Sequence, residues 1–175
     1  MSNIYKSFPL NTAVPLPGTI SGFADYNNTL PAISLTADTW TPVTNNGLGA
    51  FTNKASLPQG ITELMDTTTG AIDTTQLNIG DSIFIRNDVT ITPNTNNSLL
   101  SFRYKLGSGV NQYFLETIIG RLDSGSGQPY RFSLRTDFIY MGDDNTRLNP
   151  IELQVKLSTN GSLLNAGSVI YVSKY

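Results

Sequence analysis

The 175-residue chain contains no histidine and no cysteine. Without histidine, it lacks the base most suited to neutral pH, the usual zinc or iron ligand, and every His-dependent catalytic triad. Without cysteine, it can form neither a disulfide nor a thiolate metal site, and it has no thiol nucleophile. Carboxylates are the groups that remain for acid–base chemistry. We therefore expect a protein that is not an enzyme and that binds no metal or other cofactor.

Charge is also scarce. Charged residues make up 14% of the chain and the net charge is −2, whereas about a quarter of an average globular domain is charged. No run of lysine and arginine occurs, so the chain lacks the basic footprint of a nucleic-acid-binding protein. No apolar run is long enough for a membrane span, and the opening MSNIYKSFPL has no signal-like apolar stretch. We expect neither nucleic acid nor a membrane among the partners.

Alternation of apolar and polar side chains is the strongest pattern present. It recurs from residue 83 in IFIRNDVTIT, SLLSFRYKL and IELQVKLST, and a period of two is the signature of a strand with one buried face. Turns rich in glycine, asparagine and aspartate separate these stretches, and no segment shows a convincing helical period. In YRFSLRTDFIYM, alternation predicts that one face holds Tyr130, Phe132, Leu134, Phe138 and Tyr140.

This pattern predicts an all-β sandwich or barrel. The strand lengths, roughly nine to twelve residues, favour a jelly-roll β-sandwich of about eight antiparallel strands over an immunoglobulin sandwich.

A proline-rich segment precedes the strands. Residues 1–31 hold four of the nine prolines. Because proline fixes φ and donates no backbone hydrogen bond, we expect an extended segment that lies outside any sheet. The segment is nevertheless more apolar than a free linker. We place an extended N-terminal arm at residues 1–31 and the β-sandwich domain at residues 32–175. The arm either wraps its own domain or contacts a partner through Ile4, Tyr5, Phe8, Leu10, Val14 and Leu16.

Three places carry residue types that can support chemistry or binding. Glu116, in YFLETII, is the best lone acid or base, but a glycosidase needs two converging carboxylates, and an interface or solvent-facing charge explains it equally. Asp143, Asp144 and Asn145 offer oxygen ligands for Ca²⁺, yet their spacing is not that of an EF-hand and such residues normally cap their own backbone. Trp40 is more often a core or interface anchor than a platform for a sugar.

The last eight residues, SVIYVSKY, alternate to the end of the sequence. One face would carry Ile170 and Val172, and the other Val169, Tyr171 and Tyr175. Apolar side chains on both faces are typical of a central strand that is covered on both sides. The domain's own second sheet would be one cover. A neighbouring subunit would be the other, and we assign Val169, Tyr171 and Tyr175 to that interface.

The closing stretch NAGSVIYVSKY resembles the end of jelly rolls of the tumour-necrosis-factor and C1q type. There, a small-residue turn precedes a final alternating strand of the inner sheet, near a threefold axis. Across the chain, several stretches resemble virion proteins of tailed bacteriophages that share this domain: ISLTADTWTPVTNNGLGAFTN, LNIGDSIFIRNDVTITP, LLSFRYKLGSG and NPIELQVKLSTNG.

This resemblance implies a trimeric structural protein of a virion. The expected function is that of a homotrimeric capsid decoration (cement) protein, which binds the head shell through its N-terminal arm and stabilises it. Its partners would be its own copies and the major capsid protein or another virion structural protein. It would lie on the capsid surface or in an appendage. The alternative is a receptor- or glycan-binding tip of a fibre-like appendage, with Trp40 or loop tyrosines against the sugar.

Overall fold

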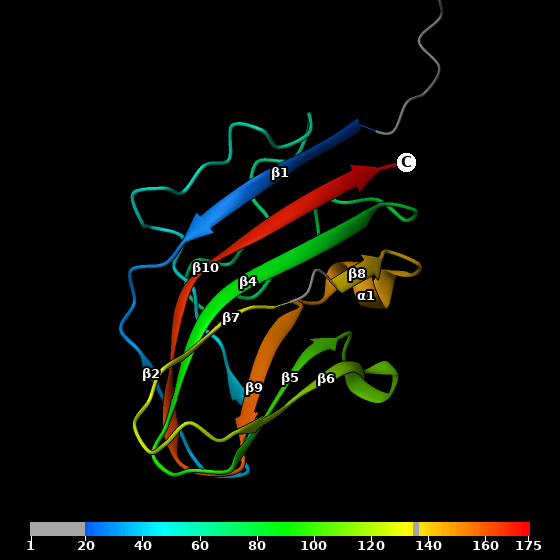
Figure 1. Ribbon diagram of the computed structural model, residues 1–175. Helices are drawn as coiled ribbons and strands as arrows, with labels where there is room; N and C mark the ends of the chain where they lie inside the picture. Colours follow the sequence, from blue (N-terminus) through cyan, green and yellow to red (C-terminus); the bar gives the residue numbers. More distant parts are fainter. Residues whose placement is uncertain (1–19, 135–136) are drawn as a thin grey trace, which may run out of the picture.

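The computed structural model describes residues 20–134 and 137–175, and ten strands in this part of the chain form two antiparallel sheets that pack face to face (Figure 1). The strands of sheet A are β1 (Ile20–Asn27), β2 (Ile33–Leu35), β4 (Ser82–Pro93), β7 (Tyr130–Ser133), β8 (Asp137–Tyr140) and β10 (Gly161–Lys174). The strands of sheet B are β3 (Thr41–Pro42), β5 (Ser98–Leu106), β6 (Tyr113–Leu122) and β9 (Glu152–Leu157). Two short helices, η1 (Gly109–Asn111) and α1 (Asp144–Leu148), lie in connections. Neither is long and apolar enough to cross a membrane.

The strand order is that of a jelly roll. Sheet A runs β1–β10–β4–β7, with β2 also beside β10 and β8 also beside β4, and sheet B runs β3–β9–β5–β6. The chain changes sheet after β2, β3, β4, β6, β8 and β9. Because β1 and β2 share one neighbour and β7 and β8 share another, the ten strands fill eight positions. The predicted sandwich of antiparallel strands is confirmed.

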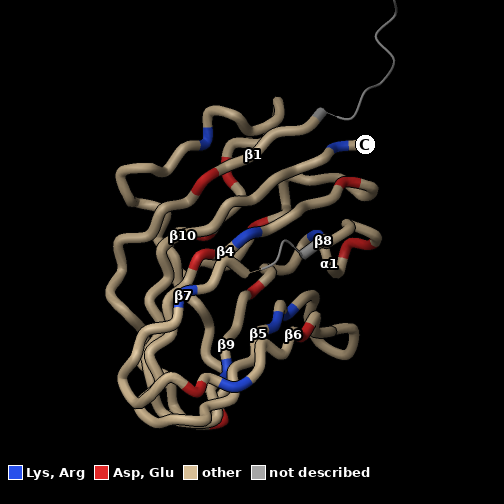
Figure 2. The backbone as a smooth tube through the Cα atoms, in the orientation of Figure 1, with Lys and Arg blue, Asp and Glu red and all other residues tan. Residues whose placement is uncertain are grey.

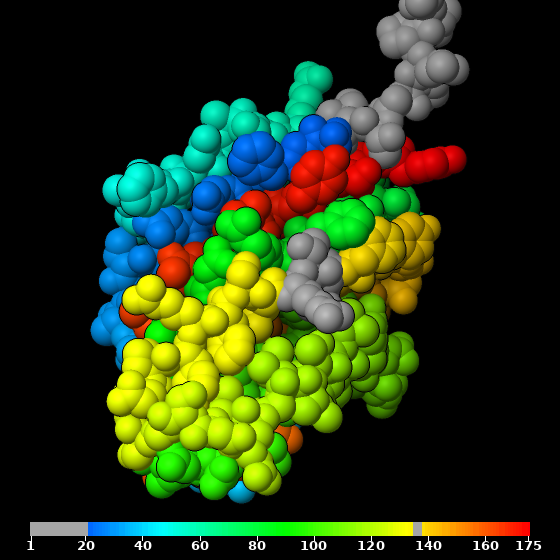
Figure 3. Space-filling model, viewed as in Figure 1, coloured from blue at the N-terminus to red at the C-terminus, as the bar shows by residue number. Residues whose placement is uncertain are grey.

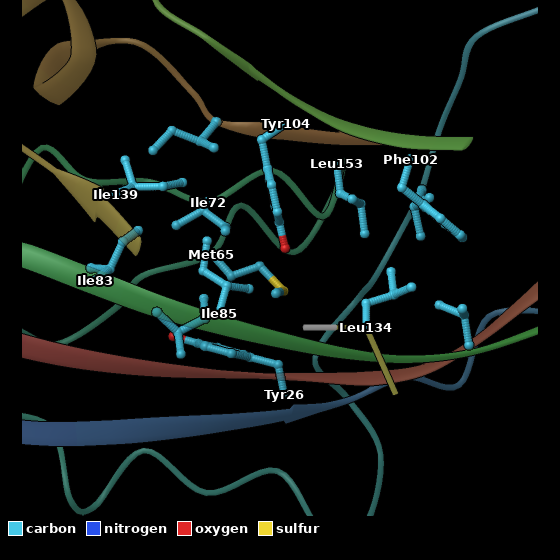
Figure 4. Packing of buried hydrophobic residues seen from close by; sticks show 14 of the residues in the cluster. Tyr26, Met65, Ile72, Ile83, Ile85, Phe102, Tyr104, Leu134, Ile139 and Leu153 are labelled. Carbon is cyan, nitrogen blue, oxygen red and sulfur yellow. The ribbon is translucent and has the colours of Figure 1, made fainter. Parts of the chain in front are cut away.

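The alternating stretches bury the faces that the sequence predicted. Ile83 and Ile85 of β4 are fully buried, and Tyr104 of β5 and Leu153 of β9 point into the same core from the opposite sheet (Figure 4). Burying one such side chain contributes about 1.5–3 kcal/mol, so a two-sheet core of this kind holds the fold without disulfides. The other predicted core positions that are buried are Val89, Ile91, Leu100, Phe102, Leu106, Ile151, Val155 and Leu157.

The prediction for YRFSLRTDFIYM is wrong in its second half. Leu134 is buried as expected, but Phe138 and Tyr140 are 55% and 53% exposed, while Ile139 and Met141 are buried instead. The stretch forms two strands, because β7 ends at Ser133 and β8 begins at Asp137. Between the two strands, the set of alternating residues that faces the core changes. A shift of one residue moves a whole set of side chains to the other face, and a single alternation pattern cannot detect it.

The structure places Ile20–Asn27, which the sequence assigned to the arm, in sheet A as β1. β1 pairs with β10 from Ile20–Lys174 to Asn27–Gly167. The prolines of the N-terminal segment stand at positions 9, 15, 17 and 31, so this stretch is free of proline and can join a sheet. The sandwich therefore begins before residue 32. Residues 1–19, with the predicted contact residues of the arm, lie outside the described part of the chain.

The long connection between β3 and β4 adds to the core. Leu64, Met65 and Leu77 are buried, and so is Ile72 within DTTTGAIDTT, although most residues of that stretch are polar. The backbone of Ile72 exchanges two hydrogen bonds with Ile151, of 2.9 and 3.0 Å. This connection therefore contributes side chains and backbone pairing to the sandwich rather than standing free of it.

A chain of buried polar side chains crosses the core. The Asn87 amide donates to the Tyr104 hydroxyl at 2.5 Å and accepts from the Ser168 hydroxyl at 2.6 Å. Asn45 in turn donates to Ser168 Oγ at 3.3 Å and to the Tyr26 carbonyl at 3.0 Å. Buried polar groups cost free energy unless they are hydrogen-bonded. This chain links both sheets and the β3–β4 connection in one specific arrangement.

Candidate functional site

Four aromatic side chains line up on the outer face of sheet A, one on each of four adjacent strands. Phe23 of β1 lies opposite Tyr171 of β10, Tyr171 lies opposite Phe84 of β4, and Phe84 lies opposite Phe138 of β8. We call these four residues the aromatic row. Their side chains are 41% (Phe23), 40% (Tyr171), 36% (Phe84) and 55% (Phe138) exposed. Figure 3 shows the surface that these strands build together.

The rings of the aromatic row contact each other. The Phe84 and Phe138 centroids are 5.1 Å apart with the ring planes at 53°, and the Phe84 and Tyr171 centroids are 6.1 Å apart at 61°. Tilted and edge-on contacts are the arrangements that aromatic pairs favour, and cross-strand pairs are the unit of sheet stabilisation. The row is thus held in place before any partner arrives, which lowers the entropic cost of binding.

Small and charged residues border the aromatic row. On one side the next register positions are Ser21, Ser173, Ser82 and the exposed Tyr140. On the other side Arg86 and Asp88 form an ion pair of 3.1 Å on β4. Across the described chain, basic and acidic positions are interspersed, without a large cluster of one sign (Figure 2). An apolar centre with a polar border is the usual composition of a protein–protein interface.

The arrangement favours binding of a protein surface. One face of an antiparallel sheet can meet water when it carries polar side chains, but here the face carries neighbouring aromatic rings. Contiguous exposed apolar patches are uncommon on monomeric proteins, and they mark interaction sites. Aromatic residues are also enriched in interfaces.

The closing strand lies where the sequence predicted. β10 is central, with β1 and β2 on one edge and β4 on the other. Ile170 and Val172 are buried, and Tyr171 points outward in the aromatic row. Val169 lies on the same outward face, beside Arg86 in the register. Tyr175 is exposed, and its backbone N–H donates to Asp81 Oδ1 at 2.9 Å. The assignment of Val169, Tyr171 and Tyr175 to a subunit interface stays a prediction.

Sequence reasoning missed three members of the row: Phe23, Phe84 and Phe138. Phe84 had a signal, because it alternates with the buried Ile83 and Ile85. Phe138 was assigned to the wrong phase, and Phe23 was assigned to the arm. None of the three has a sequence neighbour that indicates the others, because the cross-strand register alone brings them together.

The other candidate residues do not converge on one cleft. Glu116 is exposed on β6, opposite Arg103 of β5. Asp143 caps α1 by accepting from the Thr146 N–H at 2.7 Å, which is the capping alternative. Asp144 forms an ion pair of 2.9 Å with Arg147. No group of three acidic, histidine or cysteine side chains within the described ranges can hold a metal ion.

The Trp40 ring makes cation–π contacts with Arg103 and Lys156. The guanidinium carbon of Arg103 is 4.1 Å from the Trp40 ring centroid and 3.9 Å from that of Phe114. Lys156 Nζ is 4.6 Å from the Trp40 ring. Burial lowers the pKa of Arg103, and the nearby Glu116 charge opposes that shift. Since cation–π contacts already occupy Trp40, a sugar that stacked on it there would have to displace a cation.

Comparisons with known proteins give structural likenesses only. No protein-family model matches the chain, and no curated protein matches it. Among solved structures, the PRD1 vertex protein P5 aligns with a TM-score of 0.41 and 15% identity over 90% of this chain and 97% of that chain. Two structures of infectious bursal disease virus, strains Gt and Gx, align with TM-scores of 0.37 and 0.36 and with 13% and 14% identity. Both alignments cover 91% of this chain, and they cover 58% and 59% of the viral chains.

Proposed function

We propose that this protein is a homotrimeric structural protein of a virion, of the capsid decoration (cement) type. The observation that carries the proposal is the aromatic row. The row crosses the closing strand β10, which contributes Tyr171. The resemblance to jelly rolls of the tumour-necrosis-factor and C1q type implies that the sheet of this strand lies near a threefold axis. Copies that meet through this face would cover the exposed rings.

The proposed attachment to the shell uses the N-terminal segment. Full burial of one apolar side chain contributes at most about 1.5–3 kcal/mol. Three arms on one trimer multiply such modest contacts into strong overall binding. The proposed contact residues on the head shell are Ile4, Tyr5, Phe8, Leu10, Val14 and Leu16. The partner would be the major capsid protein or another structural protein of the virion.

Replacing Ile4, Tyr5 and Phe8 together by serine tests the attachment. We expect the variant to keep the mass of the unmodified oligomer and to lose at least 100-fold in affinity for particles, because three apolar contacts disappear from each of three arms. Co-sedimentation with particles that lack the protein measures the affinity.

A matched control for this variant replaces the polar neighbours Ser2, Asn3 and Ser7 by alanine. It should bind particles like the unmodified protein. Undiminished particle binding by the triple serine variant would contradict the arm contact, and it would leave trimer formation through sheet A to be tested separately.

A further inference from the structure

β6 is an unprotected sheet edge. It pairs with β5 on one side and, within residues 20–134 and 137–175, with no strand on the other. The other three edges of the two sheets are blunted. The β3–β4 connection donates and accepts backbone hydrogen bonds along β1, β3 is two residues long and ends in proline, and β7 and β8 have four residues each. β6 has ten residues, without proline or lysine, and its register with β5 is regular from Tyr113 to Ile118 and shifts at Ile119. Proteins seldom leave such an edge open.

The side chains of β6 are exposed on both of its faces. Phe114, Glu116 and Ile118 point outward from sheet B, since they pair with Lys105, Arg103 and Ser101. The opposite face borders a groove of about 390 Å³ between β6 and β7, which opens into the core. Apolar side chains of both sheets line this groove: Phe102, Tyr104, Leu115, Ile119, Phe132 and Leu134. The edge therefore offers unpaired backbone groups beside an apolar groove, which is the arrangement that an added strand completes.

We propose that residues 4–8 of the same chain form an antiparallel strand on the regular part of β6, opposite residues 114–118. The segment SNIYKSF has no proline, and it is followed by Pro9, which would end the strand. In this register Tyr5 would lie opposite Thr117 and face the groove. The pairs on the outer face would be Ile4 with Ile118, Lys6 with Glu116, and Phe8 with Phe114.

Opposite charges and matched apolar side chains lie across from each other in this register. Glu116 is the one acidic residue of β6 and Lys6 the one charged residue of the segment, and opposite charges directly across a strand pair stabilise it. The two aromatic residues would be neighbours, and so would the two isoleucines. A slip by one residue would place Lys6 over the apolar groove, and a slip by two would move it away from Glu116, so one register is favoured.

The chain length and the start of β1 also permit this pairing. Ile20 pairs with Lys174, at the end of the sandwich where the C-terminus, α1 and the start of β6 lie (Figure 1). At that end, Tyr113 Oη and Thr146 Oγ1 of α1 are 3.2 Å apart. The path from β1 to β6 crosses about three strand spacings of 4.8 Å and one sheet separation of about 10 Å. Residues 9–19 span up to about 36 Å, and the chain direction makes the added strand antiparallel.

In the free protein, the N-terminal segment would pair with β6. The same residues are proposed to contact the shell, so the shell and β6 would compete for them, and shell binding would release the segment from β6. This competition rests on the proposed function. The experiments below use free protein without particles. A failure of the pairing is thus distinguishable from a failure of the shell contact.

Disulfide trapping tests the register, because the chain has no native cysteine. The variant K6C/E116C should form an intrachain disulfide under mild oxidation at least tenfold faster than the control K6C/T117C, whose second cysteine faces the groove. Non-reducing electrophoresis and peptide mass spectrometry detect the bond. Equal rates in the two variants, or bonds that form only between chains, would overturn the proposal.

Hydrogen exchange gives a second, independent readout. In the unmodified chain, amides of residues 114–118 should be protected, including those that face away from β5. Lys6→Glu should raise exchange at these outer amides at least tenfold, whereas Lys6→Arg should leave it unchanged. If the outer amides exchange at the same rate in all three proteins, no strand covers this edge.

Discussion

Phe84→Asp is expected to convert the proposed trimer into single chains. Phe84 is one of the two inner members of the aromatic row and contacts both Phe138 and Tyr171. A carboxylate at this position would be desolvated in a subunit contact without a partner, at a cost of several kcal/mol. A loss of about 2 kcal/mol already weakens binding about 30-fold, and a closed ring of three copies contains the contact three times. Light scattering on a sizing column should show three times 19.0 kDa for the unmodified protein and 19.0 kDa for the variant.

Phe51→Asp is the matched control for this experiment. Phe51 is a phenylalanine of the β3–β4 connection and is 79% exposed, outside the aromatic row. The control should keep the mass of the unmodified protein, and both variants should keep its β-sheet circular dichroism. A Phe84→Asp protein that still has the mass of three chains would place the trimer contact elsewhere. An unmodified protein with the mass of one chain would contradict the proposal of a trimer in solution.

Asn87→Ala is expected to cost about 2–4 kcal/mol of unfolding free energy, although Asn87 touches neither proposed interface. Its side chain is 4% exposed, and it bridges Tyr104 of sheet B and Ser168 of β10. The alanine would leave a buried hydroxyl on each side with one partner fewer, and each lost partner costs about 1–3 kcal/mol. For a chain of this length the melting temperature should fall by about 5–15 °C, which calorimetry measures.

Asn96→Ala controls for the loss of an asparagine amide at an exposed site. Asn96 lies in the turn between β4 and β5 and is exposed, so its replacement should change stability by less than about 0.5 kcal/mol. Two variants with equal melting temperatures would mean that water or rearrangement satisfies the core hydroxyls when Asn87 is absent. The buried polar chain would then contribute little to stability.

Much of the fold could be predicted because local burial imposes alternation. Ile83, Ile85, Val155 and Leu157 each stand two residues from another buried position, and this period needs no knowledge of the partner strand. The central place of β10 was also predictable, since apolar residues on both faces indicate cover on both sides. The phase change between Leu134 and Phe138 was not, because the buried Ile139 and Met141 stand an odd number of residues from the buried Leu134, and a single alternation pattern cannot indicate such a shift.

The candidate site was predictable only in its central strand. Tyr171 could be assigned to an outward face from its neighbours in the sequence. Its partners Phe23 and Phe84 could not be assigned to it, because they belong to strands far away along the chain. Proline content concealed β1, since averaging over residues 1–31 hid a stretch of eight residues that contains none. Trp40 gave no sign in the sequence that Arg103 and Lys156 cover it.

The amino-acid sequence by itself determined the chemistry that is absent and the class of fold. Missing histidine and cysteine, low charge and a period of two are properties of the chain that no folding changes. The tertiary structure decided which side chains became neighbours. The registers of β1, β10, β4 and β8 bring four separate aromatic residues into one row, and the jelly-roll order leaves β6 at an edge. Surfaces of this kind depend on pairing between distant segments, and that pairing is set by the packing of the whole sandwich.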